Sequence, residues 1–201
     1  MDHLLECAEA FEQLLDVQYH IVLGRKNRLT ELTLRFDPTE FHHLVGLHKL
    51  RDLRLARGNR EKIFHQILSK TICMEDIKKS CYFPEIQDHM CFFDKIEYLL
   101  DSNETIFRYN EKLQTFSMIE AEYLLSTPYK EMDIYIFLDR NIEQGYFFCR
   151  SFFQKGEKDY TKGQAVYTYT LLKKEKTIVS TGKTVVQYDR LMLRCWGQKV
   201  F

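Results

Sequence analysis

The second half of the chain carries six short runs rich in Tyr, Phe, Ile, Val and Thr, and they constrain the fold more than any other feature. Polar or glycine-bearing turns separate the runs. They cover 104–110, 117–125, 133–140, 146–153, 165–174 and 184–193. β-Branched and aromatic side chains fit a pleated, half-buried surface, so the runs predict strands, although the first two could equally be helical. We expect an antiparallel sheet of four to six strands.

The first half instead has the pattern of helices around one small β-hairpin. Apolar residues recur at helical spacing, and Asp37, Asn59 and Pro84 stand where helices begin. Helices followed by strands predict an α+β domain, with the sheet packed on the helices. The expected helices lie at 3–16, 41–50, 60–68, 71–80 and 84–100, and the hairpin pairs 19–23 with 29–36. The length fits a single domain, 1–201.

Charge and composition restrict the functional classes. The 29 basic residues balance 29 acidic ones, which argues against a large basic surface for nucleic acid. No apolar run approaches the roughly 20 residues of a membrane span, and the N-terminus lacks a leader pattern, so we expect no membrane contact and a cytoplasmic location. The six cysteines form no C-x-x-C, and no glycine-rich phosphate loop or H-E-x-x-H is present, so neither metal nor cofactor is expected.

Three histidines and a lysine are concentrated in the expected helix 41–50. Asp37 and Pro38 form a good helix start, and a helical wheel places His48 within the apolar arc, with His42 and Lys49 on a neighbouring stripe. Burial and a nearby lysine both disfavour the charged imidazole, which suits a general base. For any one histidine the more common explanation is a buried structural residue with a backbone partner. The clustering is what indicates function.

Arg150 is embedded in the apolar run 146–153, where an unpaired buried charge is costly. It therefore binds a phosphate or a carbonyl, pairs with an internal acid such as Glu120 or Glu122, or extends to solvent from an edge of the sheet. A basic run follows the histidine segment and includes Arg51, Arg54 and Arg57. It is either a solvated surface or a rim that contacts phosphate.

Cleavage of RNA without a metal needs a base for the 2′-hydroxyl, an acid for the leaving oxygen, and a cation for the phosphate. His42 or His48 can serve as the base, with Lys49 and Arg150 as the electrostatic clamp. The hydroxyls of Ser151 and Tyr160 can donate to the phosphate.

Several segments together resemble a known family. They are 19–26 (YHIVLGRK), 36–37 (FD), 41–50 (FHHLVGLHKL), 107–110 (FRYN), 120–125 (EAEYLL), 150–153 (RSFF) and 159–163 (DYTKG). This set is similar to the phage- and mobile-element-associated barnase-EndoU-colicin-RelE-like (BECR) nuclease domains of Gram-positive bacteria. The resemblance covers about 18–174, leaving an N-terminal helix, 1–17, and a C-terminal strand extension, 175–201. It implies helices followed by an antiparallel sheet, and RNA cleavage without a metal.

The resemblance implies catalytic roles for the matching residues of this chain, and the basic and aromatic residues nearby are expected to bind substrate. The catalytic set is His42, His48, Lys49, Arg150 and Ser151, and the substrate-binding set is Arg51, Arg54, Arg57, Tyr160 and Lys162.

Two functional hypotheses remain open. The first is a metal-independent endoribonuclease or toxin-like effector of phage or prophage origin, acting on RNA such as tRNA. The second is a non-catalytic phage protein that binds a host enzyme or defence protein through aromatic strand residues, namely Tyr135, Phe137, Tyr167 and Tyr169. Convergence of His48, Arg150 and a hydroxyl in one concave site would favour the enzyme.

Overall fold

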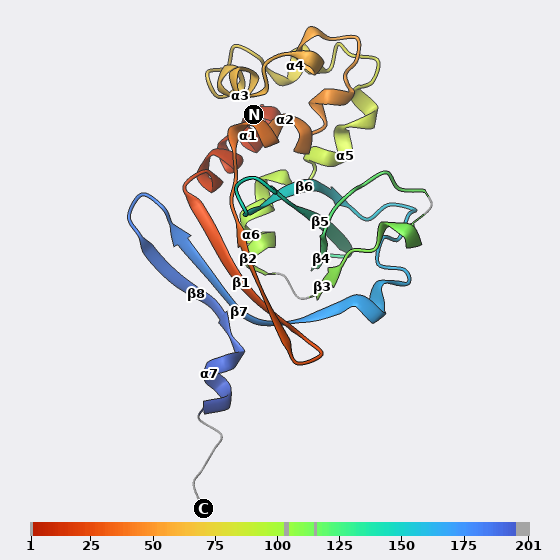
Figure 1. The fold of residues 1–201 in the computed structure, drawn as a ribbon. Coiled ribbons are helices and arrows are strands. Elements are labelled where there is room, and N and C mark those ends of the chain that lie inside the picture. Colours follow the sequence, from red (N-terminus) through yellow and green to blue (C-terminus); the bar gives the residue numbers. More distant parts are fainter. Residues whose placement is uncertain (1, 103–104, 115, 196–201) are drawn as a thin grey trace, which may run out of the picture.

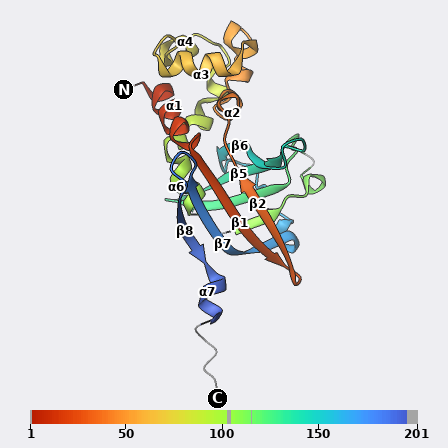
Figure 2. The ribbon, with the colours of Figure 1, turned by 60° about the vertical axis from the view of Figure 1, so that its left-hand side comes forward.

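The strands form a closed barrel, with most helices gathered at one end of it (Figures 1 and 2). The computed structural model describes residues 2–102, 105–114 and 116–195. Its helices are α1 His3–Leu14, α2 Pro38–Leu44, α3 Arg60–Leu68, α4 Met74–Ile77, α5 Gln87–Met90, α6 Ile96–Asp101 and α7 Arg190–Cys195. Its strands are β1 Val17–Arg25, β2 Arg28–Leu34, β3 Thr105–Arg108, β4 Tyr123–Tyr129, β5 Met132–Arg140, β6 Phe147–Gln154, β7 Thr168–Ile178 and β8 Lys183–Asp189.

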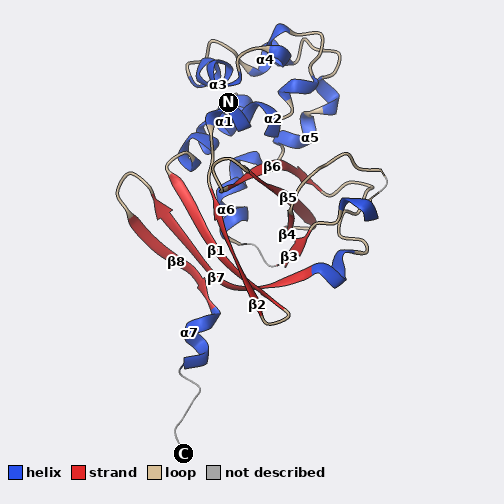
Figure 3. Ribbon diagram, viewed as in Figure 1, coloured by secondary structure: helices blue, strands red, loops and turns tan. Residues whose placement is uncertain are grey.

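Seven strands close the barrel within the described part of the chain, in the order β1-β2-β6-β5-β4-β3-β7, and β7 returns to β1. β1 and β7 pair antiparallel from Val17 opposite Ile178 to Gly24 opposite Thr170. The β2–β6 contact is parallel and short, with Leu34 opposite Phe147. β8 adds to β7 outside the ring (Figure 3).

The expected fold, a helical first half packed on an open antiparallel sheet, is therefore wrong. The hairpin β1–β2 is not a separate appendage, because it contributes two of the barrel strands. Closure pairs the start of the chain with residues 170–178, and no local pattern encodes a contact of that sequence separation. Closing the sheet also removes strand edges that would otherwise be open to other chains.

Alternation along the strands divides the apolar residues into two cores. The larger core includes Tyr123 and Leu125 of β4 together with helix residues such as Phe11 and Phe41. The smaller core lies on the opposite strand face and contains Leu124, and the loops before β4 and after β6 cover it. The pocket described below lies beside this second core.

Buried Lys174 ties α6 to the barrel. Its Nζ donates to the carbonyl of Leu100 at 2.6 Å, and Tyr19 OH donates to Asp101 Oδ1 at 2.7 Å. Burial lowers the pKa of Lys174 to about 8, and carbonyls at the C-terminal end of α6 accept hydrogen bonds from its Nζ.

Several helix and strand bounds differ from expectation. The helix expected at 84–100 is divided into short turns, α5 and α6, and that at 71–80 shortens to α4. The run 117–125 contributes a strand only from Tyr123, and the run 184–193 ends as a strand at Asp189, where α7 begins. Helix α1, the Asn59-capped α3 and the hairpin are confirmed. In the described part of the chain, no helix has the length and apolar character needed to cross a bilayer.

Candidate functional site

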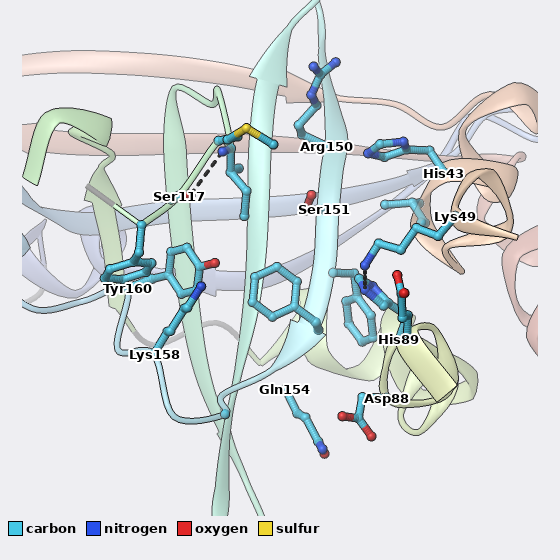
Figure 4. Close-up of a pocket in the computed structure, with 18 of the residues that line it drawn as sticks. His43, Lys49, Asp88, His89, Ser117, Arg150, Ser151, Gln154, Lys158 and Tyr160 are labelled. Carbon is cyan, nitrogen blue, oxygen red and sulfur yellow. Dashed lines mark hydrogen bonds between the residues drawn. The ribbon is translucent and has the colours of Figure 1, made fainter. Parts of the chain in front are cut away.

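A pocket of about 680 Å³ lies against β6, between the histidine segment with α5 on one side and the loops near Ser117 and Tyr160 on the other (Figure 4). A second pocket, of about 610 Å³, shares His43 and Arg150 with it. The polar residues that line the first pocket include His43, His48, Lys49, His89, Arg150 and Ser151.

Helix α2 begins as the sequence predicts but ends earlier than expected. Asp37 Oδ1 accepts from the backbone N–H of Thr39 at 2.9 Å, and Pro38 occupies the first turn. Gly46 then adopts φ 81°, and a separate 3₁₀ turn, Leu47–Lys49, follows. The single helix expected over 41–50 is therefore wrong, because the left-handed Gly46 changes the direction of the chain. The wheel that placed His48 in the apolar arc does not apply beyond this break.

The break brings the rings of His43 and His48 face to face. Their centroids are 4.2 Å apart and the ring planes differ by 15°. Burial and the charge of Arg150 lower the pKa of His43 to about 4, and burial with neighbouring His43 lowers that of His48 to about 3. Both imidazoles are therefore neutral at pH 7 and able to accept a proton. His48 itself is half-buried rather than fully buried.

Lys49 and His89 form the second polar pair of the pocket (Figure 4). Lys49 Nζ lies 2.8 Å from His89 Nε2. Burial lowers the pKa of Lys49, although Glu85 opposes the shift, and burial with the Lys49 charge lowers the pKa of His89 to about 4. A neutral imidazole joined to a lysine of reduced basicity is suited to proton transfer.

Arg150 occupies a β-bulge. Ser151 faces Phe137 and Cys149 faces Leu138, so Arg150 is the extra residue between two consecutive pairs of the β5–β6 ladder. The bulge breaks the alternation of faces that a regular strand has, so that Cys149 and Phe152 both enter the larger core. Bulges re-aim side chains beside functional sites. Here the bulge leaves Arg150 on the wall shared by the two pockets.

Arg150 has no carboxylate within 4.0 Å among the described residues. Of the two internal acids considered for it, Glu122 pairs with Arg108 instead. Glu120 forms no ion pair among the residues described. An arginine at a pocket wall without an acid partner is available to an anionic ligand.

The pocket brings together His48, Lys49, Arg150, Ser151 and Tyr160 of the predicted residues. His42 lies elsewhere: it is 1% exposed, and its Nε2 is 2.8 Å from the carbonyl oxygen of Leu55. Since a carbonyl only accepts, His42 donates through Nε2 and holds the next segment in place.

The expected basic rim is spread out. Arg51 lies over the ring of Tyr82, and Arg54 lines a third pocket between α3 and α4. Arg57 and Lys162 line none of the three pockets described here, although the Lys162 carbonyl accepts from Gln114. None of these four residues lines the first pocket.

Two histidines that line the pocket were not among the predicted site residues. His43 is next to His42 in sequence, but the helical wheel singled out His42 and His48 instead. His89 lies in α5, where no sequence motif indicates a functional residue. Its role becomes evident only from its contact with Lys49, 40 positions earlier in the chain. Within the described ranges, no group of three or more His, Cys, Asp or Glu could hold a metal ion.

The aromatic residues proposed for a protein-binding surface are only partly available. Tyr135 and Phe137 are each 0% exposed within the second core, whereas Tyr167 and Tyr169 are half-buried. Burial removes two of the four side chains on which that alternative depended.

Comparison with known proteins identifies the family of the chain. A family model described as phage-Barnase-EndoU-ColicinE5/D-RelE like nuclease 4 matches residues 3–191, which include α1 and β8. The chain belongs to this nuclease family. The suspected family is thereby confirmed, although the barrel differs from the open sheet that the resemblance implied. No curated protein and no solved structure matches the chain.

Proposed function

We propose that the chain is a metal-independent endoribonuclease, a toxin-like effector of phage or prophage origin that cleaves cytoplasmic RNA such as tRNA. One observation carries the proposal: a single pocket combines neutral histidines, a lysine of lowered pKa and an arginine that forms no ion pair with any described residue. These groups supply base, acid and phosphate clamp. The nuclease family to which the chain belongs supports the same reaction class.

In the proposed reaction, Arg150 binds the scissile phosphate and the Ser151 hydroxyl donates to one of its oxygens. His43, which burial and the Arg150 charge keep neutral by lowering its pKa, takes the proton from the 2′-hydroxyl. The 2′-oxygen then bonds to phosphorus, and the bond from phosphorus to the 5′-oxygen breaks. The Lys49 ammonium gives the leaving oxygen its proton. The products are a 2′,3′-cyclic phosphate and a 5′-hydroxyl.

His48 and His89 act as positioning residues in this scheme. The ring of His48 stacks on His43 and fixes its plane, and His89 holds the Lys49 ammonium. Tyr160 lies on the opposite side of the pocket, where it can contact the substrate beyond the phosphate. Arg51, Arg54 and Arg57 would contact RNA only where a longer substrate extends over the helical end.

The decisive experiment measures cleavage of total tRNA in the presence of a chelator. Parent protein should cleave, and His43→Gln and Arg150→Ala should each lower the rate roughly 100-fold, the usual loss for a general base or a charge clamp. His65→Gln on α3 and Arg28→Ala at the start of β2 are matched exposed controls that should cleave normally. Thermal unfolding must first establish that each variant is folded.

Failure of the parent to cleave any RNA, or normal cleavage by folded His43 and Arg150 variants, would contradict the proposal. A chelator-sensitive activity would contradict its metal independence.

A further inference from the structure

The pocket wall opposite the histidines is aromatic. Phe116, Phe153 and Tyr160 line it, with ring centroids 5.3 Å apart for Phe116 and Tyr160 and 5.4 Å apart for Phe153 and Tyr160. In Figure 4 labelled Tyr160 and Lys158 lie on one side of β6 and His43, Lys49 and His89 on the other, with Ser151 between them. One pocket therefore has a polar half and an aromatic half.

Hydrogen bonds outside the polar half hold the loop that carries Tyr160, while Phe153 meets the ring of His89 edge-on, with the ring centroids 5.9 Å apart. Buried Gln114 donates through Nε2 to the carbonyls of Tyr160 at 3.2 Å and Lys162 at 2.9 Å. Asp159 accepts from Tyr135 OH at 3.0 Å and from Lys155 Nζ at 2.9 Å. These bonds fix the loop that carries Tyr160. The ring is thus pre-positioned, which lowers the entropy cost of binding a ligand.

The front of this wall is open to solvent. Phe116 is 42% exposed and Met118 is 97% exposed, although both line a pocket with several charged groups. Lys158 Nζ lies 5.1 Å from the centre of the Phe116 ring. An exposed ring, an exposed thioether and a nearby cation make a surface suited to a flat, anionic, partly apolar ligand.

We propose that Phe116, Phe153 and Tyr160 form a nucleobase-stacking subsite, so that the substrate of this pocket is single-stranded RNA. This inference rests on the proposed function, because it takes the phosphate to lie at Arg150. Every nucleobase has a π-face that can stack on an aromatic ring. In a duplex those faces are covered by neighbouring base pairs, so only an unpaired base can reach the wall.

The neutral net charge of the chain is compatible with such a subsite. Duplex binding by shape relies on many phosphate contacts and a broad basic surface. A site that holds one phosphate with Arg150 and one base by stacking needs few cations. Lys158 sits where it can pair with the phosphate next to the stacked base.

Binding can be tested without cleavage. The probe is a short single-stranded oligonucleotide with 2′-deoxyribose throughout, which lacks the attacking hydroxyl. Phe116→Ala should weaken its binding about tenfold, which corresponds to about 1.4 kcal/mol. Phe116→Trp should retain binding, and its fluorescence should be quenched on stacking, in a Trp196→Phe background because the chain has 1 Trp. Tyr98→Ala, at a ring 56% exposed on α6, is the matched control and should bind as the parent does.

A second comparison uses the same sequence as a closed duplex, which should bind at least about tenfold more weakly than the single strand. If the parent cleaves RNA but Phe116→Ala binds and cleaves normally, or duplex binds as tightly as single strand, the stacking subsite is overturned and the nuclease proposal stands. If the parent neither binds the probe nor cleaves RNA, the nuclease proposal fails, and the subsite falls with it.

Discussion

Lys49 Nζ lies 2.8 Å from His89 Nε2, joining a 3₁₀ turn after α2 to the α5 turn 40 positions later. If Lys49 is charged, its ammonium donates, and His89 must accept through Nε2 and carry its proton on Nδ1. Protonation of His89 would break this bond and place two cations in contact. The pair therefore carries one positive charge, and it stays on Lys49, because burial and the Lys49 charge lower the pKa of His89 to about 4.

Replacement of Lys49 by Met tests this coupling. The pKa of His89 should rise from about 4 but stay below 6.5, because burial is the larger cause of its shift and the Lys49 charge the second. NMR titration of the imidazole measures the change, and RNA cleavage should fall roughly 100-fold with the loss of the acid. Lys62→Met, at an exposed position on α3, should alter neither quantity. An unchanged His89 titration would contradict the assignment.

The three pocket histidines should make the protein less stable in acid. Their pKa values in the folded state are about 4 for His43, 3 for His48 and 4 for His89, against 6.5 for the free side chain. Between pH 6.5 and about 4 the unfolded chain binds more protons than the folded one, so the free energy of unfolding falls as the pH falls. Urea denaturation should show the midpoint decreasing over this window. His43→Gln should make the urea midpoint decrease less steeply with falling pH, whereas His65→Gln should not. Equal slopes for the two variants would show that buried His43 does not cause the loss of stability in acid.

Glu40 should change the stability with pH in the direction opposite to that of the histidines. Burial raises the pKa of its carboxyl from 4.5 to about 8, and Oε2 is buried without a hydrogen-bond partner among the described residues. As the pH rises from 4.5 to about 8, the unfolded chain loses this proton first, so the contribution to stability is progressively lost. Glu40→Gln mimics the neutral acid and should unfold at a higher denaturant concentration than the parent at pH 8, with the difference shrinking toward pH 4.5. A difference that does not vary with pH would show that Glu40 is not protonated in the folded protein.

Gly46→Ala should destabilise the fold by about 1–3 kcal/mol, the range for a strained backbone combined with overpacking. Gly46 has φ 81°, and an added Cβ would lie 2.8 Å from Ile86 Cγ2. Gly145 has φ 77° with nothing within 4 Å of the added carbon, so Gly145→Ala reports the backbone strain alone. Denaturant unfolding of the two variants separates strain from steric overlap. Equal losses would mean that Ile86 gives way without cost.

Much of the local structure was predictable because its causes are local. Asp37 and Asn59 cap α2 and α3 through bonds from nearby backbone N–H groups. Lys26 and Asn27 both take positive φ, as the two-residue turn between β1 and β2 requires. The same reasoning failed at Gly46. Apolar residues recur at helical spacing on both sides of this glycine, but the helix ends before it. The reasoning also failed in β6, where the bulge at Arg150 interrupts the alternation.

Helix caps, the hairpin, most strand positions, the family resemblance and the concentration of histidines around 42–48 can all be read from the sequence. The closure of the sheet, the bond from His42 to Leu55, the entry of His43 into the pocket and the contact of His89 with Lys49 become evident only in the folded chain. Caps and turns depend on contacts a few residues apart, which a sequence states directly. Closure of the barrel and assembly of the pocket depend on which distant segments pack together. The free energy of the whole core determines that packing.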